Sequence, residues 1–399
     1  MAFRRFVPSG YSSSQAAPLF VVAHGFGSSP LTSARHTKME IAAEVQGALT
    51  VFPNGLKVGP ARGWSFPGCN SVPLVGETDC KGRRATCSSF SSTCATNCPS
   101  PYATNVSGCD DGASMGCSNW AGNGNCNWCG CSDDESFIRS LVADVKNKLC
   151  VDEAQVVMAG MSQGGMFTSW VSTRMGDLFS GFAPVSGTNP RDFYEEVDGD
   201  ADFSMLWIHG TEDTVVASDG TAGRWSDTFV YERPMDDAAR VAAKFGCDEV
   251  VSVALDVAAL AGDIKSSHEL VCSEHQHCNL TAAGNARRVV YCMWKGDHDW
   301  AQSTVGQHKA WGSTMMMKYM LARSKVLPSH VANNHTADCT VVKSKKKGAM
   351  AFGIVMLIAG VGVVGYFAKT KLYDPPHGAG GARYSVVTNS EGGGGGNND

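Results

Sequence analysis

Three side chains in this sequence, Ser162, Asp213 and His298, have the types and the order along the chain that nucleophilic catalysis needs. A serine hydroxyl is a weak nucleophile, so an imidazole must remove its proton during attack. A carboxylate fixes the tautomer of that imidazole and stabilises its protonated form. Two backbone N–H groups must also bind the oxyanion that forms, and each such donor is worth roughly 3 kcal/mol.

Ser162 lies at a turn between an apolar run and a helical pattern. Val156–Ala159 has the composition of a buried strand, the sequence of residues 160–164 (GMSQG) follows it, and apolar residues then recur at helical spacing. The glycines suit a strained turn whose helix packs close to the strand. The five-residue pattern is common by chance, and a glycine-rich loop is the alternative. Strand, turn and helix together predict a nucleophile elbow.

The oxyanion donors must come from this elbow and from a loop after an early strand. Pro18–Val22 has the composition of a buried strand, and the sequence His-Gly-Phe-Gly follows shortly after it at residues 24–27. We assign the two donors to the backbone N–H groups of Phe26 and Gln163. We expect His24 to hold the loop by hydrogen bonds and to take no part in catalysis.

The acid and the base are expected on loops that follow later strands. Phe203–His209 is a strand run, and Asp213 comes shortly after it, with Glu212 as the alternative acid. His298 follows the strand run Val289–Trp294, which completes the chain order serine, acid, histidine. Four other histidines compete for the role of base: His268, His275, His277 and His308. We interpret the first three as part of a polar, solvated loop. Metal-ligand spacing such as His-Glu-x-x-His is absent, and we expect no metal and no cofactor.

Ten of the 16 cysteines fall between Cys69 and Cys131. This segment is poor in Leu, Ile and Val, so its order must come from cross-links, and we expect disulfides formed in an oxidising compartment. Two alternatives remain open, a zinc site and redox chemistry at the Cys126–Cys129 pair. The zinc ligands would be Cys117, Cys126, Cys129 and Cys131.

Tryptophans near the expected site are candidates for contact with a flat or sugar-like substrate. Trp64 and Trp300 are our candidate substrate-binding residues, and Trp120 and Trp128 lie in the cysteine-rich segment. Packing of these aromatic rings against the protein interior is the alternative.

The chain resembles the feruloyl esterase and poly(3-hydroxybutyrate) depolymerase-like α/β-hydrolases of carbohydrate esterase family 1. The resembling stretches, in order, are 7–11 (VPSGY), the His24-Gly25 loop, 133–138, 150–152, the elbow with Gly164-Gly165-Met166, 183–185, 209–213 and 296–300. The resemblance implies an α/β-hydrolase fold, with a mostly parallel sheet and helices on both faces, and places the family's triad on Ser162, Asp213 and His298.

The same resemblance implies a serine esterase that acts on feruloyl or acetyl esters of cell-wall polysaccharide. A depolymerase of polyhydroxybutyrate-type polyester is the alternative substrate class. The family often has Gly-His-x-Trp-Pro at the histidine, whereas residues 296–301 read GDHDWA; it often has Asn after the serine, where this chain has Gln163. A non-catalytic surface-binding protein on a hydrolase fold is the alternative from another class.

Composition divides the chain into four parts. We expect a hydrolase domain at residues 1–325 with a cysteine-rich insertion at 69–132, a polar stalk at 326–347, a transmembrane helix at 348–367 and a disordered Gly-rich tail at 368–399. Gly348–Phe367 is uncharged and long enough to cross a bilayer, and lysines flank it.

The cysteines and the sequons predict that the hydrolase domain faces the cell exterior or an organelle lumen. Asn105, Asn279 and Asn334 all precede the expected span and are candidate glycosylation sites. The lysine count around the span slightly favours the opposite orientation. We expect a signal peptide upstream of Met1, and a cytosolic protein with free thiols is the alternative. The net charge of −5 argues against nucleic acid as a partner.

Overall fold

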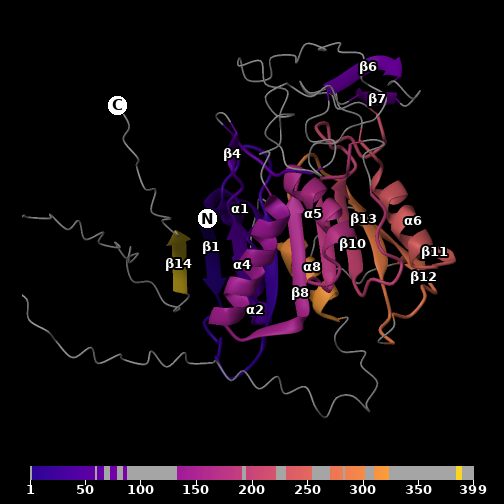
Figure 1. Cartoon of the computed structure of the whole chain (residues 1–399). Helices are drawn as coiled ribbons and strands as arrows, with labels where there is room; N and C mark the ends of the chain where they lie inside the picture. The colour runs from indigo at the N-terminus through magenta and orange to yellow at the C-terminus, as the bar shows by residue number, and fades with distance from the viewer. Residues whose placement is uncertain are drawn as a thin grey trace, which may run out of the picture.

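The computed structural model describes residues 2–58, 61–66, 72–78, 84–87, 133–190, 195–221, 231–253, 270–281, 284–301, 310–322 and 383–388. Within these ranges, ten strands form one sheet in the order β11-β12-β13-β10-β9-β8-β2-β3-β1-β14 (Figure 1). In chain order they are β1 (Ala2–Val7), β2 (Ala17–Ala23), β3 (Leu49–Pro53), β8 (Val151–Met161), β9 (Gly181–Val185), β10 (Ser204–Gly210), β11 (Glu249–Val253), β12 (Val271–Gln276), β13 (Val289–Trp294) and β14 (Arg383–Thr388).

The middle of the sheet is parallel, and its flanks are antiparallel. β3, β2, β8, β9, β10 and β13 run in one direction. β1 pairs antiparallel with β3, and β12 pairs antiparallel with β13. Every residue of β9 and β10 is buried, which is typical of parallel strands covered on both faces. The carboxyl ends of the six parallel strands share one edge, where the following loops meet.

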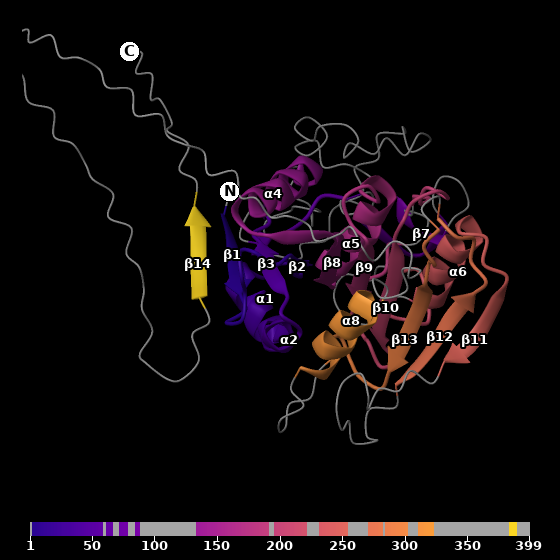
Figure 2. The ribbon, with the colours of Figure 1, turned by 90° about the horizontal axis from the view of Figure 1, so that it is seen from below.

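Helices cover both faces of the sheet (Figure 2). One face carries α4 (Asp134–Lys148), α5 (Gln163–Arg174) and α6 (Pro234–Lys244), and the other carries α1 (Pro30–Thr37), α2 (Met39–Gln46) and α8 (Trp311–Ala322). Each set packs on its own buried cluster, which includes Phe137 and Phe167 on the first face and Met316 and Tyr319 on the second. The mostly parallel sheet with helices on both faces confirms the architecture expected from the sequence.

Helix α4 follows the sequence pattern closely. Its apolar residues face the core, and the Asp133 side chain accepts a hydrogen bond from the backbone N–H of Ser136 at 2.9 Å, which caps the first turn. Acids in the first turn and lysines in the last turn complement the helix dipole. Asp134 is buried and accepts a hydrogen bond from the Ser65 N–H at 2.8 Å, so the helix also anchors the segment before the cysteine-rich insertion.

The cysteine-rich insertion is described only at a two-stranded hairpin, β6 (Val72–Thr78) and β7 (Arg84–Cys87). Its expected disulfides, the zinc alternative and the redox pair therefore lie outside the described residues. Disulfides do occur elsewhere: Cys247 is bonded to Cys278 and Cys272 to Cys292. The expectation of a cross-linked chain is confirmed at these two bonds.

Beyond Ala322, the structure describes only Arg383–Thr388, in the part of the chain expected to be a disordered tail. No helix in the described ranges is long and apolar enough to cross a membrane, and the stalk and Gly348–Phe367 lie outside those ranges. The expectation of a tail disordered throughout is wrong for Arg383–Thr388, which pair antiparallel with β1 as β14. Tyr, Val and Thr in this segment favour strands, and β1 offers it an open edge.

Candidate active site

Ser162 occupies the turn between β8 and α5 with a strained backbone. Its φ of 54° and ψ of −126° are rare for a residue other than glycine. Its N–H donates to the Val185 carbonyl at 2.9 Å, and its own carbonyl accepts from the Gly165 N–H at 2.8 Å. Such strain persists only where the surroundings fix the conformation, and it is common at active sites. The predicted strand, turn and helix are all present.

Glycines allow the close packing around this turn. A Cβ atom at Gly160 would lie 2.1 Å from the Gly164 carbonyl oxygen, and one at Gly164 would lie 2.4 Å from the carbonyl oxygen of Ala23 on β2. One at Gly187, after β9, would lie 2.2 Å from the Ser162 carbonyl oxygen. The elbow therefore fits against two neighbouring strands only because these positions lack side chains.

The loop after β2 passes beside the serine, as predicted. A Cβ atom at Gly25 would lie 3.4 Å from the Ser162 Cβ and 3.9 Å from its Oγ. Phe26 is the next residue of that loop, and Gln163 begins α5. Of the two residues assigned to the oxyanion hole, Phe26 therefore follows a residue that lies beside Ser162, and Gln163 follows Ser162 directly in the sequence.

His24 holds this loop in a neutral state. Its Nδ1 donates to the Gly25 carbonyl at 2.8 Å, and its Nε2 accepts from the Gly55 N–H at 3.0 Å, which fixes the Nδ1–H tautomer. Burial lowers the pKa of His24 to about 4. The structural role expected for His24 is confirmed.

The two tryptophans proposed to bind substrate are both buried, and that prediction is wrong. Trp64 is 0% exposed and stacks on Phe167, and its indole N–H donates to the His24 carbonyl at 2.7 Å. Trp300 is 1% exposed, and its indole N–H donates to Ser313 Oγ at 2.9 Å. Burial of so large an apolar ring stabilises the fold, and each indole N–H is hydrogen-bonded to a partner inside the protein.

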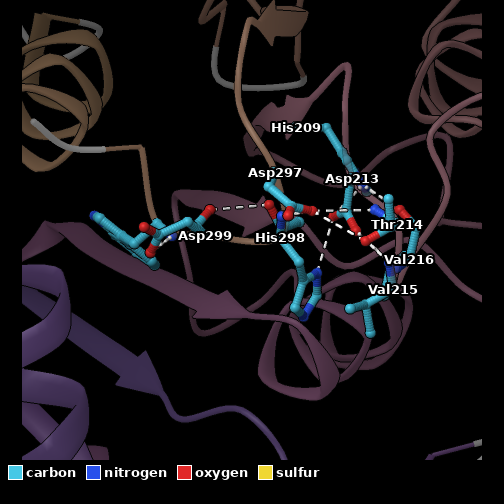
Figure 3. A network of polar contacts seen from close by, with 10 residues as sticks. His209, Asp213, Thr214, Val215, Val216, Asp297, His298 and Asp299 are labelled. Atoms are coloured by element: carbon cyan, nitrogen blue, oxygen red, sulfur yellow. Dashed lines mark hydrogen bonds and ion pairs between the residues drawn. The ribbon is translucent and has the colours of Figure 1, made fainter. Parts of the chain in front are cut away.

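Asp213 and His298 meet at the carboxyl edge of the sheet (Figure 3). His298 Nδ1 lies 2.9 Å from Asp213 Oδ2. The Asp213 side chain has no exposed surface, and its Oδ1 accepts hydrogen bonds from the N–H groups of Val215 at 2.9 Å and Val216 at 2.8 Å. Burial by itself would raise the pKa of Asp213, but hydrogen bonds from His209 and His298 outweigh burial and lower the pKa to about 2. The carboxylate is therefore ionised at neutral pH.

The competing residues do not reach this position. Glu212 is exposed, and Asp213 is the acid that contacts His298, as predicted. His277 is exposed and pairs with Asp248 at 2.9 Å. His275 is 8% exposed and lies on β12, so the expectation that it belongs to a solvated loop is wrong. His268 and His308 lie outside the described residues.

Two further contacts hold the His298 loop in place. Asp297 Oδ1 accepts from the His298 N–H at 2.8 Å and from the Thr214 N–H at 3.2 Å, so it ties this loop to the one that carries Asp213 (Figure 3). The Ser186 hydroxyl donates to the Asp299 carbonyl at 3.0 Å, which joins the loop to the end of β9. Sequence reasoning assigned no role to Asp297; its position directly before the histidine was the available signal.

A second imidazole, that of His209, also contacts the carboxylate. His209 ends β10 with 1% of its surface exposed, and its Nε2 lies 3.1 Å from Asp213 Oδ2. Sequence reasoning read His209 only as the end of a strand. Its spacing of four residues before Asp213 was the signal that was available.

Glycosylation of the three asparagines and the absence of a metal stay predictions. Asn279 is exposed, which suits glycosylation, while Asn105 and Asn334 lie outside the described residues. In the described part of the chain, no group of three or more His, Cys, Asp or Glu side chains is arranged to hold a metal ion.

Comparison with known proteins gives limited matches. No family model matches the chain. Feruloyl esterase B of Piromyces equi is 30% identical over 94 residues, which are 22% of this chain. That stretch spans 17% of the length of the curated relative.

Solved structures with similar folds include esterases of low sequence identity. An acetyl xylan esterase from Aspergillus awamori has a TM-score of 0.40 and 13% identity, over 74% of this chain and 88% of that one. An S-formylglutathione hydrolase from Agrobacterium tumefaciens has a TM-score of 0.40 and 10% identity, over 80% and 89% of the two chains. TM-scores at this level carry no conclusion about function, so the functional assignment depends on the residues of the site.

Proposed function

We propose that this chain is a serine hydrolase of carboxylic esters, with Ser162 as nucleophile, His298 as general base and acid, and Asp213 as the orienting carboxylate. One observation carries the proposal: His298 Nδ1 lies 2.9 Å from a buried, ionised Asp213, at the sheet edge where Ser162 occupies a strained elbow. A serine, an imidazole and a carboxylate so ordered are the functional groups of acyl transfer.

The reaction follows from the roles of these groups. Ser162 Oγ forms a bond to the ester carbonyl carbon while His298 Nε2 takes the hydroxyl proton. The N–H groups of Phe26 and Gln163 bind the oxyanion of the tetrahedral intermediate. His298 then gives its proton to the departing alcohol oxygen as the C–O bond breaks. Water, deprotonated by His298, attacks the acyl-enzyme, and protonation of Ser162 Oγ releases the acid.

Substrate binding must complete one contact in this scheme. Within the described residues, no hydrogen bond joins the Ser162 hydroxyl to His298, although the elbow and the His298 loop lie at the same edge of the sheet. Contacts of this kind are often long before substrate is bound and shorten in the reactive complex. The anchors on the His298 loop, through Asp297 and Ser186, limit how far it has to move.

Feruloyl or acetyl esters of cell-wall polysaccharide are the proposed substrate class. The 94-residue similarity to a feruloyl esterase supports this choice. Polyester of the polyhydroxybutyrate type is the second candidate, from the family resemblance in the sequence. A purely binding role has less support, because a binding protein has no need of a histidine paired with a buried carboxylate beside a strained serine.

We further propose that the hydrolase domain faces the exterior or a lumen and is anchored by Gly348–Phe367. The disulfides Cys247–Cys278 and Cys272–Cys292 and the exposed Asn279 support this side of the membrane. A single crossing by Gly348–Phe367 would separate β14 from β1, since β14 follows that segment. The β1–β14 pairing and this anchor exclude each other, so detection of that pairing in the membrane-bound protein would reject the anchor. Protease added to intact cells should release an active fragment; an unglycosylated, protected protein would place the hydrolase in the cytosol.

An ester panel on the full chain, made in an oxidising host, tests the activity. The panel contains p-nitrophenyl acetate, methyl ferulate and hydroxybutyrate oligomers, each with wild type and with Ser162→Ala. We expect wild type to hydrolyse at least one ester and Ser162→Ala to lose that hydrolysis while its unfolding transition is unchanged. Hydrolysis by wild type and Ser162→Ala at equal rates would reject Ser162 as nucleophile. Absence of hydrolysis across the panel would favour the binding role.

A further inference from the structure

We infer that His209 is a positioning residue for the proposed hydrolysis, acting through Asp213 to hold the carboxylate toward His298. The inference rests on the proposed function and names a residue that the reaction scheme does not require. Its basis is geometric: one carboxylate oxygen, Asp213 Oδ2, lies 3.1 Å from His209 Nε2 and 2.9 Å from His298 Nδ1 (Figure 3).

The protonation of His209 follows from its neighbours. Its Nε2 also lies 2.8 Å from the backbone carbonyl oxygen of Val216. Both neighbours of this nitrogen are acceptors, because a carbonyl oxygen and an ionised carboxylate have no proton to give. His209 Nε2 must therefore carry a hydrogen; this nitrogen is hydrogen-bonded to the Val216 carbonyl and lies 3.1 Å from Asp213 Oδ2.

With His209 in place, both carboxylate oxygens of Asp213 have two partners each. Oδ1 is held by the N–H groups of Val215 and Val216, and Oδ2 by the two imidazoles. Without His209, Oδ2 would keep only His298 as its imidazole partner, and the carboxylate would be held less firmly against a turn about its bond to Cβ. A turn of this kind moves the acceptor away from His298 Nδ1 and releases the tautomer that catalysis needs.

His209 is not itself placed to serve as the base. It is 1% exposed at the end of β10, and the nitrogen it directs to the site is occupied by two acceptors. The His298 side chain is 16% exposed and presents Nδ1 to Asp213, which leaves its Nε2 for the serine. The two imidazoles therefore have different roles around the same carboxylate.

Substitutions that separate volume from hydrogen bonding test the inference. His209→Phe keeps a ring and removes the donor, whereas His209→Gln places an amide N–H near the position of Nε2. We expect His209→Phe to lower kcat about 10- to 100-fold, the range found when an outer hydrogen-bond partner of a metal-ligating side chain is removed. KM should change less than about threefold, because uniform binding is untouched. His209→Gln should recover kcat to within about threefold of wild type.

A matched control removes a buried histidine far from the carboxylate. His275 is 8% exposed on β12, and its Nε2 has no hydrogen-bond partner in the described part of the chain. His275→Phe should leave kcat and KM unchanged. Urea unfolding of every variant establishes that it is folded, and His209→Met replaces His209→Phe if the latter does not fold.

The outcomes separate this inference from the proposed function. A folded His209→Phe or His209→Met with kcat within twofold of wild type would overturn the positioning role while Ser162→Ala remains inactive. Equal loss of kcat in folded His209→Gln and His209→Phe would also overturn it, since the donor would not matter. Stoichiometric labelling of Ser162 by a p-nitrophenyl phosphonate reports the nucleophile independently of the ester chosen; labelling absent in wild type would reject the proposed function itself.

Discussion

The indole N–H of Trp64 donates a hydrogen bond to the backbone carbonyl of His24, with 2.7 Å between the two atoms. The backbone N–H of the same tryptophan donates to the side-chain oxygen of Gln163 at 3.2 Å. One buried residue therefore contacts both the loop and the elbow that carry the proposed oxyanion donors. We therefore expect the spacing between those donors to depend on Trp64.

Trp64→Phe should reduce activity without changing substrate affinity. The variant keeps most of the buried ring and loses the bond to His24, so we expect a loss of about 1 kcal/mol in the free energy of unfolding. We expect kcat to fall and KM to remain unchanged. Trp64→Ala should cost about 3–5 kcal/mol, measured by urea unfolding. Leu56→Ala, at a 56% exposed position nearby, is the control. A raised KM with unchanged stability would instead return Trp64 to the substrate site.

Asp213→Asn should be far more damaging than Glu212→Gln. The asparagine amide would present a donor or a neutral oxygen to His298 Nδ1 and favour the wrong tautomer, a change that costs about 10⁴ in kcat in a serine protease. Glu212 is exposed, and its substitution should change kcat less than about twofold. The measurement is kcat on the ester that wild type hydrolyses, with circular dichroism as the check on folding. The reverse ranking would make Glu212 the acid.

The contribution of His24 to the stability of the fold should fall as the pH drops from about 6.5 to about 4. The folded protein holds the pKa of His24 at about 4, below its ordinary value of 6.5, so this residue binds more protons in the unfolded state in this interval and its contribution rises with pH. The contribution is fully present above about pH 6.5, and about 3 kcal/mol is lost by pH 4. Burial raises the pKa of Asp237 to about 7, so that residue changes stability in the opposite direction, and only a comparison with a His24 variant isolates the effect.

His24→Gln provides the comparison for this pH dependence. A glutamine oxygen can accept from the Gly55 N–H without titrating, so the difference between the two stability profiles isolates His24. Urea unfolding at half-unit pH intervals measures both profiles. Parallel profiles for wild type and variant would mean that the proton on His24 has no effect on folding.

Gly160→Ala should prevent folding. The added carbon would lie 2.1 Å from the Gly164 carbonyl oxygen and 2.8 Å from Thr168 Oγ1, and backbone atoms of α5 cannot move away without breaking the elbow. We expect a destabilisation above about 4 kcal/mol, seen as insoluble or unfolded protein. Gly10→Ala is the matched control, since nothing lies within 4 Å of its added carbon. Wild-type stability in Gly160→Ala would contradict the packing described for β8 and α5.

The disulfide between Cys272 and Cys292 should stabilise the antiparallel side of the sheet. It joins directly opposed residues of β12 and β13 that lie 20 positions apart in the sequence. The double variant Cys272→Ala/Cys292→Ala should lose about 3 kcal/mol in the free energy of unfolding. Mass spectrometry under non-reducing conditions should find both bonds, Cys247–Cys278 included. Free thiols at these four positions would show that the bonds do not form.

The local parts of the site follow from short stretches of the sequence. The apolar run before Ser162, the glycines around it and the helical spacing after it predict the elbow, because strand, turn and helix each follow from residues close together in the chain. The same holds for α4, whose cap and apolar stripe lie within Asp133–Leu149, and for the strands that end before Asp213 and His298. The pairing of those two residues followed from their positions after parallel strands, whose ends share one edge.

Which side chains are buried, and which residues far apart in the sequence meet, depends on tertiary packing. In the sequence, Trp64 and Trp300 are of a residue type that often binds substrate. In the structure both are buried, because α5, α1 and α8 pack around them. His209 reads as the end of an apolar strand, and its contact with Asp213 depends on how the loop after β10 turns back. Burial and hydrogen-bond partners are properties of the packed sheet, so no local pattern of residues specifies them.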